Sequence, residues 1–265
     1  MRSLRVADVM RAMVERYPLE TAEAWDSVGL VVGDIHAEVA RIMLTVDVTP
    51  EVVQEAIATG ADMIIAHHPL LLRGVTSVAT SGTKGRILST LIKNDIALYT
   101  AHTNADVAWP GVSDAIANAF GLVVQPEVSL SGSGIGRVAT LPVAVTLREF
   151  AQIVSSKLPQ TARPVNVSGN LDELVSTVAV CGGAGDSLLD AVAALDVDVY
   201  VTSDLRHHMA QEFVLTSKCA LVDVSHWAAE WLWLPQAAEL LKQDLGGNVV
   251  VDVSTLVTDP WTHSQ

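Results

Sequence analysis

The stretch ADMIIAHHPLLLRGV (residues 61–75) contains an apolar run that ends in two adjacent histidines and a proline. Neighbouring side chains of a continuing strand point to opposite faces, so His67 and His68 would not share one site there. Pro69 removes a backbone donor and favours extended geometry at His68, which predicts that the strand ends here. At the carboxyl end of a parallel strand, both imidazoles can face the crevice where α/β proteins bind ligands. An ordinary strand end with two hydrogen-bonded histidines is the alternative.

Short apolar runs alternate with helical patterns on both sides of this stretch. Thr49 is placed to cap a helix whose first residue is Pro50, and Gly121 is placed to end another. The expected elements are strands at 39–46, 63–66 and 96–100 and helices at 6–17, 50–58, 85–93 and 112–120. Short buried strands that alternate with helices predict a mostly parallel sheet covered on both faces.

The same alternation returns in the second half of the chain. The expected elements there are strands at 176–181, 197–202, 219–224 and 248–253 and helices at 186–195, 206–215 and 226–241. Pro235 is expected to kink or divide the last helix. We interpret SGSGIGRVAT (residues 131–140) as a hairpin rather than a linker. No repeat of fixed period is found. The fold class is therefore α/β, with an N-terminal lobe at residues 1–130 and a C-terminal lobe at residues 131–265.

Composition narrows the possible functions. Half of the 265 residues are hydrophobic, which is enough for a sizeable core, and the formal net charge is −14. No basic block is present, so we expect no nucleic-acid partner, whereas acidity suits metal cations or simply solubility. Cys181 and Cys219 are far apart and form no CxxC, as in a reducing cytosol. The amino-terminal segment carries charges throughout and no apolar run approaches a membrane span, which predicts a cytoplasmic protein.

A second polar cluster lies in YTAHTNADVAWPG (residues 99–111), where another apolar strand ends. Asp106 could join His67 and His68 if the two strands are neighbours, since carboxylate and imidazole together are typical of zinc, iron or manganese sites. His102 is expected to orient a ligand, or to shuttle a proton as the catalytic residue. The alternative is that Asn104 and Asp106 only form a turn.

A third cluster lies in VDVSHWAAEWLWL (residues 222–234). Ser225 is a natural N-cap, and His226 and Glu230 then lie four residues apart on one helical face. Such a pair alone is weak support for a metal site. The support for a metal site is stronger because the pattern recurs: three predicted strand ends are each followed directly by imidazole or carboxylate groups.

The candidate metal ligands are therefore His67, His68, Asp106, His226 and Glu230. Three imidazoles and two carboxylates are too few for two closed four-coordinate shells, unless the carboxylates bridge. This count favours a dinuclear catalytic site with open positions. We therefore expect two divalent ions per chain. Ligation by imidazole and carboxylate without thiolate is compatible with zinc, manganese, iron, cobalt or nickel.

Several motifs resemble the Nif-three-like family, whose members are also called GTP cyclohydrolase I type 2 homologues. They are WDSVGLVVGD, AHHPLLLRGV, AHTNADVAWPGVSDAIANAFGL, DVYVTSDLRHH and SHWAAE. The resemblance covers nearly the whole chain. It implies two interlocked α/β lobes, a dinuclear metal site in the cleft between them and a homohexameric ring. It assigns metal ligation to the same five residues that the spacing selects.

The sequence also departs from the family pattern. Many members have glycine before the late histidine, where this chain has Ser225. That change is expected to alter the helix cap and not the ligand. Some relatives carry an extra domain inserted in mid-chain, for which this chain is too short.

Two functions are compatible with these features. The first is a metal-dependent hydrolase, similar to GTP cyclohydrolase I type 2, that acts on a small nucleotide-like or phosphorylated substrate. The second is a non-catalytic metal-binding or assembly protein that presents a ring surface to partners.

Trp25, Asp26 and Gly29 are candidates for a pocket mouth, although WDSVGL could equally be a rigid loop packed by its Trp. Further candidates are Asp204 near the site and Arg73 as an anion-binding group. His207 and His208, beside Asp204, are as readily explained as helix-face or interface residues. CGGAGDS (residues 181–187) fits a helix N-terminus capped by Asp186, with anion binding as the alternative.

Overall fold

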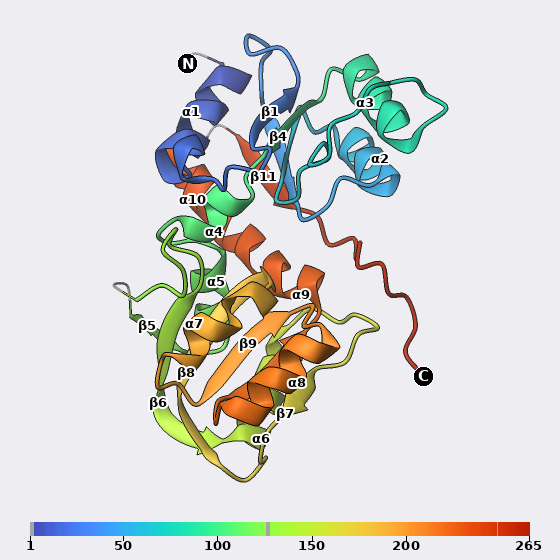
Figure 1. Cartoon of the computed structure of the whole chain (residues 1–265). Helices are drawn as coiled ribbons and strands as arrows, with labels where there is room; N and C mark the ends of the chain where they lie inside the picture. Colours follow the sequence, from blue (N-terminus) through green and yellow to red (C-terminus); the bar gives the residue numbers. More distant parts are fainter. Residues whose placement is uncertain (1–2, 126–127, 248) are drawn as a thin grey trace. The chain divides into compact units, whose positions relative to one another are not determined.

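A computed structural model describes residues 3–125, 128–247 and 249–265. The chain folds into two compact units, each assembled from separate segments (Figure 1). The first comprises Met1–Ala108 and Leu234–Thr258, and the second comprises Trp109–Trp233 and Asp259–Gln265. This division differs from the expected single boundary after residue 130. The reason is that β11 (Val250–Val253) returns to pair with β2 (Arg41–Thr45) of the first sheet.

The sheet of the first unit has the strand order β1-β4-β3-β2-β11. Its remaining strands are β1 (Gly29–Val32), β3 (Met63–Ala66) and β4 (Ala97–Thr100). Strands β4, β3, β2 and β11 are parallel, and only β1 at the edge is antiparallel to its neighbour β4. The structure thus confirms the parallel arrangement here. The last predicted strand began at residue 248, which lies outside the described residues.

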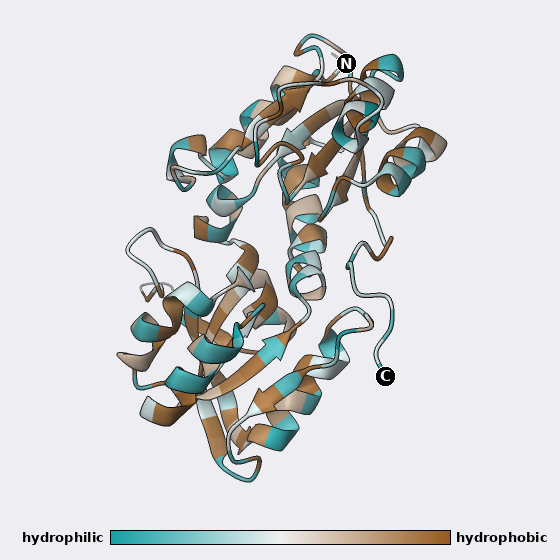
Figure 2. Cartoon of the chain, turned by 45° about the vertical axis from the view of Figure 1, so that its right-hand side comes forward, coloured by the Kyte–Doolittle hydropathy of each residue, from teal (hydrophilic) through white to brown (hydrophobic). Residues whose placement is uncertain are grey.

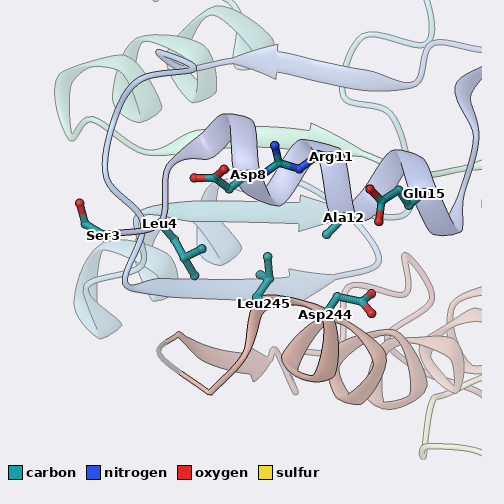
Figure 3. Close-up of a pocket in the computed structure, with 8 residues that line it drawn as sticks. All are labelled: Ser3, Leu4, Asp8, Arg11, Ala12, Glu15, Asp244 and Leu245. Atoms are coloured by element: carbon teal, nitrogen blue, oxygen red, sulfur yellow. Dashed lines mark hydrogen bonds and ion pairs between the residues drawn. The ribbon is translucent and has the colours of Figure 1, made fainter. Parts of the chain in front are cut away.

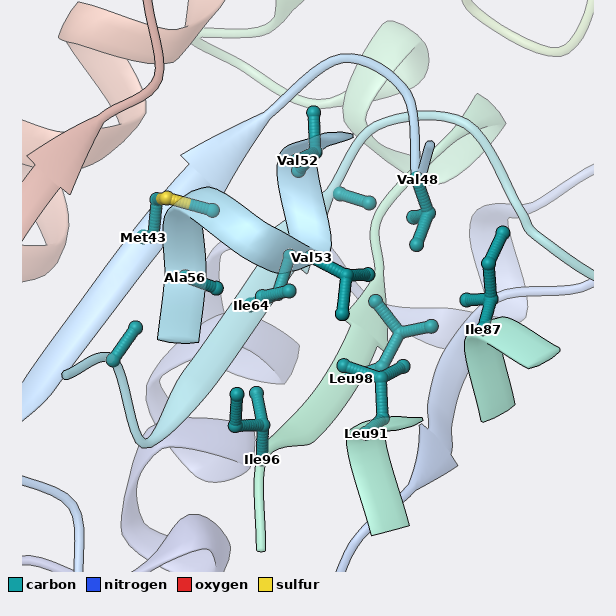
Figure 4. Packing of buried hydrophobic residues seen from close by; sticks show 12 residues of the cluster. Met43, Val48, Val52, Val53, Ala56, Ile64, Ile87, Leu91, Ile96 and Leu98 are labelled. Carbon is teal, nitrogen blue, oxygen red and sulfur yellow. The ribbon is translucent and has the colours of Figure 1, made fainter. Parts of the chain in front are cut away.

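Helices of the first unit pack on a buried parallel sheet. They are α1 (Val6–Arg16), η1 (Leu19–Thr21), α2 (Pro50–Thr59), α3 (Thr83–Lys93), α4 (Thr103–Val107) and α10 (Trp233–Leu245). As predicted, Thr49 caps α2 by accepting a hydrogen bond from Val52 N. Apolar side chains of α2 and α3 meet alternate residues of β2, β3 and β4, including Met43, Ile64 and Leu98 (Figure 4). The intervening strand residues are buried too, so both faces are covered.

The sheet of the second unit is mixed, in the order β5-β6-β8-β9-β10-β7. Its strands are β5 (Val123–Gln125), β6 (Arg137–Thr146), β7 (Asn166–Ser168), β8 (Leu174–Ala184), β9 (Val199–Ser203) and β10 (Ala220–Val224). Only β8, β9 and β10 are parallel to one another. The prediction of mostly parallel strands is therefore only partly right. The Gly/Ser-rich segment reverses the chain between β5 and β6, which pair antiparallel, so the hairpin interpretation is confirmed.

The helices predicted over 186–195 and 226–241 are each divided in two, but the helices of the second unit otherwise follow the predicted order. They are α5 (Val112–Ala119), α6 (Leu147–Lys157), η2 (Asp186–Leu188), α7 (Leu189–Ala193), α8 (His207–Thr216) and α9 (His226–Trp231). The helix predicted over 226–241 ends at Trp231, and α10 begins at Trp233. Pro235 explains this break, because it has no N–H for the carbonyl of Trp231 and its ring would collide with that group. Figure 2 shows predominantly hydrophobic strands in both sheets.

Among the described residues, every helix is too short or too polar to cross a membrane. Cys181 and Cys219 are both buried and free. Burial raises the pKa of the Cys219 thiol to about 12, so it stays protonated at neutral pH.

Candidate functional site

The first unit gathers three imidazoles at one edge of its sheet. His67 and His68 directly follow β3, and His102 follows β4 shortly after its end. Because β3 and β4 are parallel neighbours, their carboxyl ends meet at the same edge. The ring centroid of His67 lies 5.2 Å from that of His68 and 5.1 Å from that of His102. One ligand nitrogen from each lies within 4.8 Å of the others. We call these three residues the histidine cluster.

Each imidazole of the histidine cluster is held through its Nδ1 atom. The partners are Ala101 O for His67 (3.0 Å), Asp47 Oδ1 for His68 (2.7 Å) and Asp26 Oδ1 for His102 (2.9 Å). A carbonyl or an ionised carboxylate only accepts hydrogen bonds, so Nδ1 must donate. The neutral ring then carries its lone pair on Nε2. Histidines that bind metals are oriented by hydrogen bonds of this kind.

Asp106 adds a carboxylate to this cluster. It lies on the short helix α4, four residues after His102, and is largely buried. Its Oδ1 atom is 4.0 Å from Nε2 of His67. Two ligand atoms that each lie about 2.1 Å from a common ion can be separated by this distance. The first unit therefore brings together the three sequence-predicted groups His67, His68 and Asp106, and places His102 beside them as a further donor.

The loop that contains Trp25 and Asp26 lies against the histidine cluster. The Asp26 side chain is fully buried and accepts hydrogen bonds from the backbone N and the hydroxyl of Thr103. Burial alone would raise the pKa of Asp26, but its bonds to His102 and Thr103 outweigh burial and hold the pKa well below its usual range. Trp25 is 60% exposed and meets the His102 ring edge-on at 5.9 Å. The loop is thus anchored by Asp26 and leaves the indole ring accessible.

Asp47, whose carboxylate holds Nδ1 of His68, was not identified from the sequence. It follows β2 by two residues, and β2 is parallel to β3, so it reaches the same sheet edge. The signal that could have identified it is a carboxylate directly after the predicted strand at 39–46.

The second unit carries an imidazole–carboxylate pair on α9. Ser225 caps this helix, as predicted, by accepting a hydrogen bond from Ala228 N at 3.2 Å. His226 and Glu230 then face each other, with 3.0 Å between Nε2 and Oε1. The Glu230 side chain is buried, whereas that of His226 is partly exposed. The predicted one-face geometry of these two residues is therefore observed.

His226 is also held through Nδ1, by Asp204 Oδ2 at 2.7 Å. Arg163 bonds both Asp204 and Asp223, each at 2.7 Å, and so braces the carboxylate. Asp204 has a positive φ of 55°, a backbone conformation that asparagine and aspartate tolerate better than most residues. Its hydrogen bond to His226 lowers the pKa of Asp204. Burial would lower the pKa of His226, but the charge of Glu230 and the bond to Asp204 raise it to about 11 in the metal-free chain.

The CGGAGDS segment packs against this pair and is not the start of a long helix. Strand β8 continues to Ala184, and η2 covers only Asp186–Leu188 with Gly185 as its N-cap. Gly183 has a φ of +70°, and a Cβ atom there would lie 2.8 Å from Oε1 of Glu230. Asp186 does not cap a helix but pairs with Arg206. The glycine at residue 183 therefore gives the His226–Glu230 pair its room.

Other candidates lie outside these groups. Arg73 is exposed on the loop after Pro69, and His207 and His208 are exposed at the start of α8. A pocket of about 230 Å³ in the first unit is lined by none of the predicted ligands (Figure 3). Its lining residues are Ser3, Leu4, Asp8, Arg11, Ala12, Glu15, Asp244 and Leu245.

Comparison with known proteins shows the family and the fold of this chain. The model of the Duf34/NIF3 (NGG1p interacting factor 3) family matches residues 4–260. A Streptomyces coelicolor protein named GTP cyclohydrolase 1 type 2 homolog is 48% identical over 267 residues, covering 97% of this chain and 94% of the relative. A solved Bacillus cereus protein related to NIF3 has a TM-score of 0.91 at 25% identity, with both chains fully covered.

A longer relative fits the expectation of an inserted domain elsewhere in the family. The Mycobacterium tuberculosis protein of the same name is 36% identical over 369 aligned positions, covering 98% of this chain and 97% of the relative. Because this chain has 265 residues, the relative contains residues that have no counterpart here.

Proposed function

Because the chain belongs to the Duf34/NIF3 family, we propose that it is a metal-dependent hydrolase that holds two divalent ions at one dinuclear centre. The ligands are the histidine cluster with Asp106 and the His226–Glu230 pair. The proposed substrate is a small nucleotide-like or phosphorylated molecule, in line with the name GTP cyclohydrolase 1 type 2 homolog that curated relatives carry. The observation that carries the proposal is the shared orientation of four imidazoles, each held at Nδ1 by an acceptor.

The donor set fits such ions. Four imidazole nitrogens and two carboxylates, with no thiolate among them, suit zinc, manganese, iron, cobalt or nickel. The sequence selected five of these donors, and the geometry adds His102. Six donor groups shared by two ions leave coordination positions open, which is typical of catalytic rather than structural sites.

When bound, two such ions would activate water as a nucleophile and stabilise negative charge on the reacting oxygen. The residues of this chain would orient the metal ligands and bind the substrate. Asp26, Asp47 and Asp204 keep the imidazoles in one tautomer. The exposed Trp25 ring beside His102 offers a flat apolar surface on which a planar heterocycle can stack.

His102 has two competing roles. The sequence suggested a proton shuttle, but its anchoring at Nδ1 is the same as that of His67 and His68 and favours a ligand. Metal content separates the roles, because His102→Ala should keep both ions if His102 only moves a proton. We expect this variant to lose metal.

The proposal is tested by measuring metal per chain by elemental analysis on the wild type, His68→Ala and Glu230→Ala. His208→Ala is the matched control, since it removes an exposed histidine outside both ligand sets. We expect about two ions in the wild type and the control, and loss of both in either ligand variant if they share one centre. Wild-type protein should then hydrolyse a member of a nucleotide and phosphoester panel, with the activity lost in both ligand variants. Wild-type protein that binds no zinc, manganese or iron would contradict the proposal.

A non-catalytic metal-binding or assembly role is the second candidate. It is favoured by the family description, which names an interacting factor, and by a Drosophila melanogaster relative named NIF3-like protein 1 that is 31% identical. Two bound ions without turnover on any substrate would support it. We also propose the homohexameric ring that the sequence resemblance implies, and sedimentation of the purified chain tests it.

A further inference from the structure

Thr258 supports the histidine cluster from the carboxyl-terminal segment. Its hydroxyl donates a hydrogen bond to Oδ2 of Asp47. The other oxygen of that carboxylate, Oδ1, accepts the hydrogen bond from Nδ1 of His68. Thr258 thus restricts the rotation of the carboxylate that orients His68, and its contact lies entirely within the first unit.

Asp259, the next residue, supports the other ligand set. It is only 7% exposed, and its Oδ2 accepts the hydroxyl hydrogen of Ser225. With that single hydrogen committed, Ser225 Oγ presents a lone pair to Ala228 N and caps α9. The cap determines where α9 begins, and therefore how His226 and Glu230 are presented. All these contacts lie within the second unit.

We infer that Thr258 and Asp259 are positioning residues for both ligand sets, so that two consecutive residues near the carboxyl terminus control metal affinity. This inference rests on the proposed metal binding. Neither residue is a proposed ligand, and each acts through one intermediate side chain, Asp47 or Ser225. Loss of a hydrogen bond that orients a metal ligand typically lowers affinity by about 10- to 100-fold.

The carboxyl-terminal segment that contains Thr258 and Asp259 also makes a hydrogen bond away from the ligand sets. A variant that lacks this bond separates an effect on ligand orientation from an effect on general stability. Ser254 donates a hydrogen bond to Oε2 of Glu55 on α2 at 2.6 Å. This bond belongs to the same segment but includes none of the proposed ligands or the carboxylates that hold them. The same hydroxyl accepts a hydrogen bond from Leu256 N at 3.3 Å, so Ser254→Ala is a control that removes two side-chain hydrogen bonds of this segment.

The test is zinc affinity of the full-length chain, measured by competition with a chromogenic chelator, together with thermal unfolding of the metal-free protein. We expect Thr258→Val and Asp259→Ala to weaken zinc binding about 10-fold or more. Thr258→Ser, which keeps the hydroxyl, should restore wild-type affinity, and Ser254→Ala should bind as the wild type does. The visible spectrum of the cobalt(II)-loaded chain should change in Thr258→Val and not in Ser254→Ala, because only the former disturbs a ligand.

The outcomes separate this inference from the proposed function. If His68→Ala loses zinc but Thr258→Val and Asp259→Ala bind as tightly as the wild type, the positioning role is overturned and metal binding stands. If Ser254→Ala weakens binding as much as Thr258→Val, the effect is one of general stability and the inference is overturned as well. If the wild type binds no metal, both proposals are overturned. Should Asp259→Ala fail to fold, Ser225→Ala replaces it, because this variant removes the hydroxyl through which Asp259 acts. It should weaken zinc binding about 10-fold or more, and unchanged affinity would overturn the role of Asp259.

Discussion

The two units organise their sheets around the same device. In the first unit, Asp62 precedes β3, and its carboxylate accepts hydrogen bonds from the backbone N of Ala40 and of Arg41 at the start of β2. Its own carbonyl accepts from Ala97 N at the start of β4. One aspartate thus ties the central strand to both parallel neighbours.

Asp198 does the same in the second unit. It precedes β9, and its carboxylate accepts from the backbone N of Ser176 and of Thr177 in β8. Its carbonyl accepts from Ala220 N at the start of β10. In both units the strand held by the aspartate carbonyl, β4 or β10, leads to a histidine that is followed four residues later by an acid. These pairs are His102 with Asp106 and His226 with Glu230.

The units differ in the side chains that stand directly after the central strand. After β3 come two imidazoles, whereas β9 is followed by Asp204, which only orients His226. The first unit therefore offers three imidazoles, whereas the second offers only His226. The orientation of His226 depends on Asp204, which is itself held by Arg163. The comparison teaches that the scaffold determines where side chains meet, while the residues at strand ends determine whether they bind or orient.

The largest effect is expected from Gly183→Ala. The added Cβ would displace the Glu230 carboxylate and break the second ligand set. Zinc affinity should fall by about 100-fold, at the upper end of effects seen for disturbed ligand orientation. Gly60→Ala is the matched control, because Gly60 has a φ of +69° but open space around its Cβ position. Both variants should lose about 1–2 kcal/mol of stability from the left-handed backbone, and only Gly183→Ala should lose metal. If Gly183→Ala binds zinc as tightly as Gly60→Ala does, the predicted collision with Glu230 is refuted.

A smaller effect, still more than about 10-fold, is expected from Asp204→Asn. Asparagine tolerates the positive φ at this position, so the backbone is retained while the charge beside His226 is lost. Asp47→Asn makes the same change beside His68. Because the histidine cluster contains two further imidazoles, we expect this change to matter less. Isothermal titration with zinc should therefore show a greater loss for Asp204→Asn. A greater loss for Asp47→Asn would reverse our ranking of the two ligand sets.

The hydrogen bonds of Asp198 predict a pH-dependent stability. Burial raises the pKa of Asp198, but the hydrogen bonds from Thr177 and Ser176 outweigh it and lower the pKa overall. A carboxylate with a lowered folded pKa stabilises fully above its unfolded value of about 3.9 and loses this contribution as pH falls through the folded value. In metal-free protein, Asp198→Asn should lower stability at pH 7 by about 1–3 kcal/mol, and the difference from wild type should shrink below pH 4. Urea titrations of the wild type and Asp198→Asn at several pH values measure this difference. A difference that is constant with pH would contradict the assignment.

The smallest effect on the fold is expected from Trp25→Ala. Because the indole is exposed and the loop is anchored by Asp26, stability should change by no more than about 0.5 kcal/mol and metal content should not change. For a planar substrate, however, KM should rise relative to Trp25→Phe. Loss of metal in Trp25→Ala would instead show that the ring holds His102 in place.

Local signals in the sequence predicted many elements well. Strand β3 has the predicted bounds, because the apolar run MIIA ends directly at the histidines and Pro69. Helix α2 begins at Pro50 as expected, with Thr49 as its cap, and ends at Thr59, one residue after the expected end. The errors lie where distant segments combine. The antiparallel strands of the second sheet and the return of β11 to the first depend on strand order, which local periodicity does not contain.

By itself, the sequence determined which groups stand at the strand ends: His67 and His68, His102 and Asp106, and His226 and Glu230. These positions follow from short-range rules of strand ending and helix capping. Only the tertiary structure decided how the imidazoles are oriented. Asp47 is 21 residues from His68, Asp26 is 76 residues from His102, and Asp204 is 22 residues from His226. The first and third of these bonds form because parallel strands bring their carboxyl ends to one edge. The Asp26–His102 bond forms because the antiparallel strand β1 begins beside the end of β4. Such strand pairing belongs to the folded chain as a whole.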